Sequence, residues 1–319
     1  MELSLVLAVV LGLALIGAVF ELIRSERRRA PAGAPTRPAP ANVTGREALD
    51  VIDLGLRRLA AVCVRSGRAL PDAYAVVYSG DRLALRLAGS DPQVPAPWSA
   101  DAAGEEWSTD TAPLEGYGLG EEAAAEQPYA LAVTLGTAGG ERVLVDLSRA
   151  ATAIALAGGG REVRQLVRAF VAELVTGPVG RRAEVTLVGS AASADLTVGL
   201  GSARLHTVAT LEEALARGAD AAARYGPSGS ASAVTQVFRM IEGGGPVAVQ
   251  GRAPRLFVLD AAQYADEQAA AALLEAADAL LVLGEASDAG WRFGVGEDGS
   301  LDTGPLDLKI DVHAGRLNY

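Results

Sequence analysis

Hydrophobic residues in this chain follow three patterns along its length, and the first of them predicts a membrane segment. Residues 3–20 are apolar except for Ser4 and carry no charge. A helix rises about 1.5 Å per residue, so this stretch nearly spans a hydrocarbon core of about 30 Å. We therefore predict a transmembrane anchor over residues 1–24, with residues 3–23 in contact with lipid.

Basic residues follow this apolar stretch, and none precedes it. Arg24, Arg27, Arg28 and Arg29 come directly after it, whereas Glu2 is the only charge before it. The positive-inside rule then places the N-terminus outside and the body in the cytoplasm, as a single-pass protein of the cell membrane. We expect the four arginines to contact lipid headgroups. A cleaved signal peptide, a buried core helix and an exported body remain as alternatives.

The second pattern is a linker followed by a small unit. Residues 25–43 are rich in Arg and Pro, which favours an extended spacer. Residues 44–90 predict an αββ unit, because helical spacing of apolar residues gives way to two alternating runs. Its expected elements are a helix over 47–67 that begins with a capping box from Thr44 to Glu47, and strands over 74–78 and 82–87 joined by a tight turn.

An acidic segment over residues 91–128 contains Trp98 and Trp107. No Lys or Arg occurs between residues 97 and 141. We expect a solvated loop whose tryptophans cover an apolar surface of the body; the alternative is a docking segment for a basic protein partner. Its acidic residues are Asp101, Glu105, Glu106, Asp110, Glu115, Glu121, Glu122 and Glu126.

The third pattern, over residues 129–319, alternates predicted strands with helices. Such alternation favours a mainly parallel sheet with helices on both faces, in the α/β class. Predicted strands lie at 130–135, 143–147, 153–157, 184–188, 205–208, 255–259, 279–283, 291–295 and 306–312. Predicted helices lie at 161–176, at 211–225 with Thr210 as its cap, and at 265–277.

Composition narrows the function classes. The formal net charge is −11 over 319 residues, and an acidic body repels nucleic-acid phosphates, so we expect no nucleic-acid partner. Cys63 is the only cysteine, which excludes an intramolecular disulfide and fits a reducing compartment. His206 and His313 stand far apart with no cysteine beside them, so we expect no metal site.

A triple-glycine turn is the first candidate for chemistry. Gly158, Gly159 and Gly160 follow a predicted buried strand and open a predicted helix, where α/β sheets commonly bind phosphate. A phosphate-binding loop also needs a longer glycine-rich segment, a lysine and a hydroxyl, and these are missing. Arg161 is the one nearby cation, and Glu162 beside it would repel an anion. We expect a tight structural turn, with a residual anion or ATP site as the alternative.

Asp260 is the second candidate. It ends an apolar predicted strand, which is the arrangement that holds Mg²⁺ in P-loop ATPases. In those enzymes a glutamate commonly follows and polarises the attacking water, whereas here Ala261 follows. Because an aspartate at the end of a parallel strand is common without catalysis, we expect a structural role.

The order of these elements over residues 129–285 resembles FtsK/SpoIIIE-type ATPase domains, the group that includes the type VII secretion ATPase EccC. The resemblance rests on the strand ending in Val145-Asp146-Leu147, the helix over 161–176, the segment over 205–215 and the strand before Asp260. It implies a P-loop-like fold and membrane-associated work; we expect no cofactor, with ATP as the possible ligand. The missing lysine, hydroxyl and glutamate imply a degenerate relative, similar to domains of membrane-associated actinobacterial proteins.

We therefore expect a membrane-anchored interaction or scaffold protein with a non-hydrolysing ATPase-like fold. The first alternative is a nucleotide-binding or weakly active ATPase that uses the glycine turn, Arg161 and Asp260. The second is an exported, membrane-anchored domain with a binding function.

Overall fold

The structure, a computed structural model, describes residues 41–112, 128–217 and 253–317. The predicted anchor, its arginines and most of the linker lie outside the described residues. In the part of the chain that the structure describes, no helix is both long and apolar enough to cross a membrane. The described residues all belong to one compact unit, Pro38–Tyr319.

The first of two sheets has seven strands in the order β15-β5-β6-β1-β2-β4-β3, and every neighbouring pair is antiparallel. It takes strands from each of the segments expected at 44–90, 91–128 and 129–319. The strands are β1 (Ala73–Tyr78), β2 (Arg82–Leu87), β3 (Ser99–Ala100), β4 (Glu106–Asp110), β5 (Ala132–Ala138), β6 (Glu141–Asp146) and β15 (Val312–His313).

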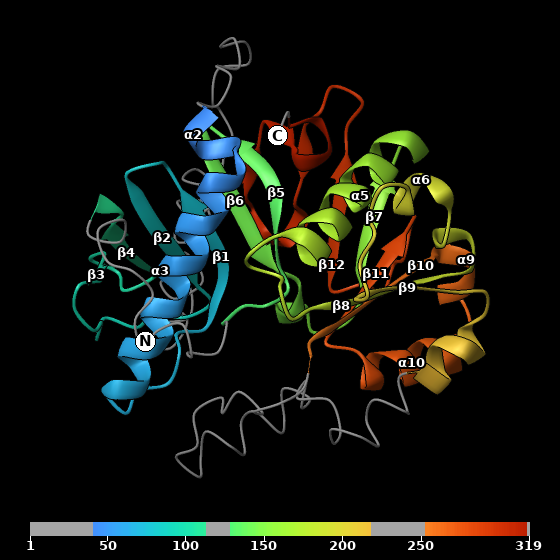
Figure 1. Ribbon diagram of the computed structural model, residues 1–319, viewed down its shortest axis with the longest axis horizontal. Helices are drawn as coiled ribbons and strands as arrows, with labels where there is room; N and C mark the ends of the chain where they lie inside the picture. Colours follow the sequence, from blue (N-terminus) through green and yellow to red (C-terminus); the bar gives the residue numbers. More distant parts are fainter. Residues whose placement is uncertain (1–40, 113–127, 218–252, 318–319) are drawn as a thin grey trace, which may run out of the picture. The chain divides into compact units, whose positions relative to one another are not determined.

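Helix α3 (Arg46–Arg65) packs on one face of this sheet, and the short α2 (Ala41–Thr44) precedes it (Figure 1). Its apolar residues recur every three or four positions, so Ile52, Leu56 and Leu59 are all fully buried. They meet alternate side chains of β1 and β2 in one core cluster. Trp98 and Trp107 join the same cluster, which confirms that the tryptophans cover apolar surface.

The second sheet has eight strands in the order β14-β13-β12-β7-β11-β10-β8-β9. The six strands from β12 to β9 run parallel, whereas β13 and β14 are antiparallel at one edge. The strands are β7 (Ile154–Gly158), β8 (Glu184–Val188), β9 (Leu205–Val208), β10 (Arg255–Asp260), β11 (Ala279–Leu283), β12 (Trp291–Val295), β13 (Leu301–Asp302) and β14 (Lys309–Ile310).

Helix α5 (Gly160–Thr176) packs against both sheets. Its buried residues share one core cluster with β5 and β6 of the first sheet and with β7, β8, β10, β11 and β12 of the second. The opposite face of the second sheet packs against other helices in a separate cluster. The remaining helices are α6 (Ala194–Thr197), α9 (Ala261–Tyr264) and α10 (Glu267–Ala276), with 3-10 turns η2 (Leu147–Arg149), η3 (Gly189–Ala191), η4 (Gly304–Leu306) and η5 (Ala314–Arg316).

The α/β class and most predicted elements are confirmed, with four corrections. The strands predicted at 130–135 and 143–147 belong to an antiparallel sheet with β1, not to the parallel sheet. Part of the acidic loop forms β3 and β4. The capping box is wrong, because Gly45 is the N-cap of α3 and has no side chain to bond.

Of the remaining C-terminal elements, one predicted helix is confirmed and the last predicted strand is the fourth correction. The helix predicted over 265–277 is confirmed as α10, which Asp266 caps by accepting a hydrogen bond from Ala269 N at 3.1 Å. The predicted last strand is broken into β14 and β15, which join different sheets. The helix predicted over 211–225 is observed for residues 211–217, and Thr210 Oγ1 accepts a hydrogen bond from Glu213 N as predicted.

Candidate functional site

The candidate residues lie where the parallel strands of the second sheet end. Gly158 ends β7 and Asp260 ends β10, with β11 between these two strands. The helix after β7 packs on one face of the sheet, and the helices after β10 pack on the other. In open α/β sheets such a change of face marks the crevice where ligands bind. The fold therefore places the predicted residues at the edge that the resemblance implies.

The connection from β7 to α5 is a single residue. Strand β7 ends at Gly158, Gly159 is the N-cap, and α5 begins at Gly160. A phosphate-binding loop wraps the phosphates with several residues between strand and helix, whereas here one residue separates them. The turn offers the first amide groups of a helix but no enclosing loop.

Packing against β12 explains why residue 158 is glycine. Its φ is +138°, a conformation that side chains rarely adopt. A Cβ at this position would lie 2.4 Å from the carbonyl oxygen of Val295, the residue paired with it on β12. Close approach of two strands therefore accounts for Gly158 without any ligand.

The N-terminus of α5 already holds a carboxylate of its own chain. A Cβ on Gly159 would lie 2.7 Å from Glu162 Oε2, so the Glu162 side chain folds back over Gly159. A negative charge in the first turn is stabilised by the positive end of the helix. Arg316, from the C-terminal turn η5, has its Nη2 3.7 Å from Glu162 Oε1. An incoming phosphate would meet this carboxylate.

Asp260 is engaged in capping a helix. Its Oδ1 accepts a hydrogen bond from Gln263 N at 2.8 Å, while its own amide donates to Gln263 Oε1 at 3.2 Å, which completes a capping box for α9. Its Oδ2 accepts a hydrogen bond from Ser190 Oγ, which follows β8. Both carboxylate oxygens therefore have structural partners.

The predicted site residues form two separate groups in the structure. One strand, β11, lies between β7 and β10, and the β7–α5 turn carries no lysine or hydroxyl. Arg161 lies at the start of α5 and is exposed. Of the predicted residues, Gly158, Gly159, Gly160 and Arg161 are contiguous, whereas Asp260 belongs to a separate network with Ser190 and Gln263.

Sequence reasoning missed two residues of this region. Glu162 was identified as a repelling neighbour of Arg161, but its position over Gly159 was not; a glutamate at the third position of a helix is the signal for it. Arg316 had no signal, since it reaches Glu162 across more than 150 positions of the chain. Among residues 41–112, 128–217 and 253–317, no cluster of metal-ligating side chains occurs.

Comparison with known proteins gives distant likenesses. No protein-family model and no curated protein matches the sequence. A structure of Thermomonospora curvata EccC (ATPases 2 and 3) in complex with a signal sequence peptide has 14% identity and a TM-score of 0.32, covering 59% of this chain and 32% of that one. The pCW3 conjugation coupling protein TcpA, in monomer form with ATPγS, has 11% identity and a TM-score of 0.30, with 78% and 83% covered.

Both of these structural neighbours are ATPases of the FtsK/SpoIIIE type. The present chain spans about a third of the EccC chain (32%). Because both TM-scores are low, we base the functional interpretation on the geometry of the β7–α5 turn and of Asp260.

Proposed function

We propose that this chain is a membrane-anchored interaction or scaffold protein whose cytoplasmic α/β body keeps an ATPase-like arrangement of strands without hydrolysing ATP. One observation carries the proposal: β7 passes into α5 through Gly159 alone, and the carboxylate of Glu162 lies over that residue. ATP would bring several negative charges to this turn. With no enclosing loop and no lysine, the helix N-terminus alone would have to offset them.

The occupied carboxylate of Asp260 supports the same proposal. A Mg²⁺ ligand needs oxygen lone pairs that are free to coordinate the ion. In this chain Oδ1 accepts from Gln263 N and Oδ2 accepts from Ser190 Oγ. Each oxygen keeps one further lone pair, so Mg²⁺ would have to share the carboxylate with the cap of α9, whose loss costs about 1 kcal/mol.

A surface for a protein partner lies at the edge of the first sheet. Asp101, Glu105 and Asp110 are exposed on and beside β3 and β4. Edge strands offer unpaired backbone groups, and the three carboxylates favour a basic partner. The remaining acidic residues of the segment, from Glu115 to Glu126, lie outside the described residues.

The alternative is a weakly active ATPase, which the place of Gly158 and Asp260 at the carboxyl edge of one parallel sheet favours. ATP turnover by the full-length chain separates the two. We expect turnover no faster than in a protein-free blank, unchanged in Arg161→Ala and Asp260→Ala. Turnover above the blank that either substitution abolishes would establish the ATPase. Loss of the α9 cap should instead lower the stability of Asp260→Ala by about 1 kcal/mol.

A further inference from the structure

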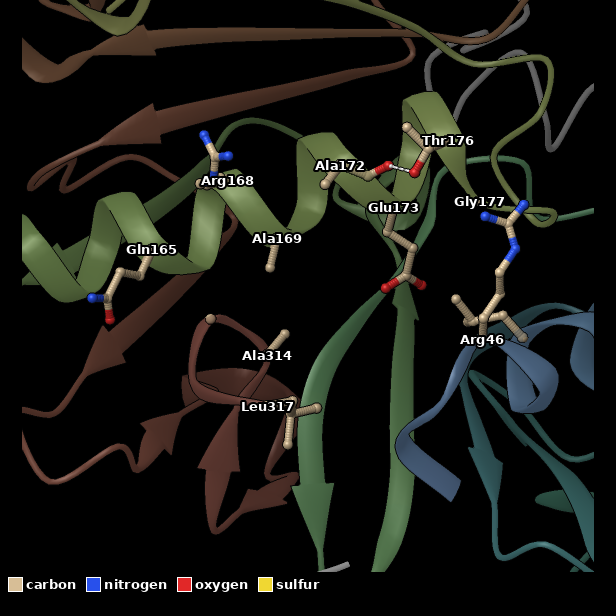
Figure 2. A pocket seen from close by; sticks show the side chains of 12 residues that line it. Arg46, Gln165, Arg168, Ala169, Ala172, Glu173, Thr176, Gly177, Ala314 and Leu317 are labelled. Atoms are coloured by element: carbon tan, nitrogen blue, oxygen red, sulfur yellow. Dashed lines mark hydrogen bonds between the residues drawn. The ribbon is translucent and has the colours of Figure 1, made fainter. Parts of the chain in front are cut away.

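A cavity of about 400 Å³ lies beside α5 and is lined by residues of this segment from Gln165 to Gly177. Ala169, Ala172 and Glu173 of α5 form one wall, and Leu49 of α3 with Ala314 and Leu317 near the C-terminus form the others (Figure 2). Glu173 is 13 residues after Gly160, which is about 20 Å along a helix. The Glu173 carboxyl is therefore well separated from the glycine turn, and the cavity volume lies within the range of small-molecule sites, about 300–1,000 Å³.

Glu173 is the polar feature of this mainly apolar cavity. Its side chain is buried, and its Oε1 accepts hydrogen bonds from the backbone N and Oγ1 of Thr134 on β5, at 3.2 and 3.0 Å. Figure 2 shows its carboxyl group pointing toward the space between Ala314 and Arg46. Burial raises the pKa of this carboxyl, although Arg142 and the Thr134 bonds act in the opposite direction.

The surroundings of Glu173 favour an additional positive charge. The residue lies in the last turn of α5, the negative end of the helix dipole, and that turn contains no basic residue. Arg168 also lines the cavity, but its guanidinium donates to the carbonyl oxygens of Asp195 and Val198 at 2.7 and 2.8 Å. Arg46 is exposed at the other side, where water weakens its attraction.

We propose that this cavity binds a small molecule with an apolar body and a primary ammonium group, and that the ammonium pairs with the Glu173 carboxylate. The alanine and leucine walls complement the apolar body. A cation in the cavity adds to the favourable charge of Arg142 and donates hydrogen bonds to the Glu173 carboxylate. An anionic ligand would add a second negative charge beside Glu173, and a neutral alcohol would add no compensating charge.

Three probes with the same ring system test this proposal: tryptamine, the neutral alcohol tryptophol and the anion indole-3-propionate. Each is titrated into the purified full-length chain, with binding followed by ligand-detected NMR. We expect tryptamine to bind more tightly than tryptophol, and indole-3-propionate to bind most weakly. Glu173→Gln keeps the side-chain volume and an acceptor for Thr134, so it should weaken tryptamine binding about tenfold or more and tryptophol binding by less than about twofold.

A second variant tests the cavity itself. Ala172→Leu retains the carboxylate but fills the space, so it should abolish binding of all three probes. Retained tryptophol binding by Glu173→Gln shows that this variant keeps the cavity. Any of three results would overturn the proposal. Tryptamine could still bind to Ala172→Leu, indole-3-propionate could bind as tightly as tryptamine or more tightly, or tryptamine could fail to bind to the native chain.

Discussion

Asp146 is a buried carboxyl group at the end of β6, and it shows how single residues in this fold carry an electrostatic cost. Its Oδ1 accepts hydrogen bonds from Ser148 N and Oγ at 3.1 and 2.9 Å. Burial nevertheless raises its pKa from 3.8 to about 6. The folded state therefore holds a proton that the unfolded chain has released, and this group lowers the free energy of unfolding as pH rises from about 4 to above 6.

Replacing Asp146 with Asn removes this titration while keeping an acceptor for Ser148. As pH rises from 4 to 8, the free energy of unfolding of Asp146→Asn should increase by about 1–3 kcal/mol relative to that of the native chain. Urea denaturation followed by tryptophan fluorescence measures it at both pH values. Bonds from Ser300 lower the pKa of Asp298 from 3.8, so its titration lies below pH 4 and Asp298→Asn should show little change between the two pH values. A pH-independent effect of Asp146→Asn would contradict the assignment.

The β7–α5 turn is the element on which the functional interpretation depends. Its three glycines have different surroundings: Gly158 touches Val295, Gly159 lies under Glu162, and Gly160 has open space around it. A glycine turn kept for packing should be sensitive to a methyl group only where a neighbour is close.

Two single substitutions compare the glycines directly. Gly158→Ala should lower the free energy of unfolding by about 1–3 kcal/mol, because the new Cβ would meet the Val295 carbonyl at a φ that alanine disfavours. Gly160→Ala, in the first helical turn, should change it by about 0.5–1 kcal/mol in the stabilising direction. Thermal unfolding of the two variants side by side measures the difference; equal effects would show that packing does not account for Gly158.

The sequence predicted the bounds of helices and strands better than it predicted which strands pair with one another. Strand β8 and strand β9 match their predicted bounds, because an apolar run or an alternating run ends at clear turn residues. Strand β4 was missed, since its inward residues are Trp107 and Thr109 between polar neighbours. Strand β6 pairs with β1, and more than 60 positions of the chain separate the paired residues. No local sequence pattern predicts this pairing.

The candidate site was predictable to a similar extent. The three glycines, Arg161 and Asp260 could be located because each follows a recognisable strand. Their contacts could not be predicted from the sequence. Glu162 over Gly159, Arg316 beside Glu162 and the hydrogen bond from Ser190 to Asp260 form only when the chain folds. Glu173 was missed, although its position on the apolar face of a predicted helix is a signal that its side chain is buried.

For the molecule as a whole, the proposed topology places the body in the cytoplasm. Native Cys63 is 1% exposed and burial raises its thiol pKa, so it should resist labelling in the folded chain. Val64 beside it is 78% exposed and offers a site for an engineered thiol.

Intact cells carrying Val64→Cys should not react with a membrane-impermeant maleimide, and the same cells should react after lysis. The native chain, with Cys63 alone, is the matched control and should stay unlabelled in both states. Labelling of Val64→Cys in intact cells would place the body outside and support the exported alternative.

The measurement that tests the central claim most directly is titration calorimetry of the full-length chain with ATP and Mg²⁺. If the β7–α5 turn is too short to enclose a phosphate and Glu162 repels it, no saturable heat should appear up to millimolar ATP. Saturable binding at micromolar affinity that Arg161→Ala abolishes would contradict the account, because the turn would then hold phosphate.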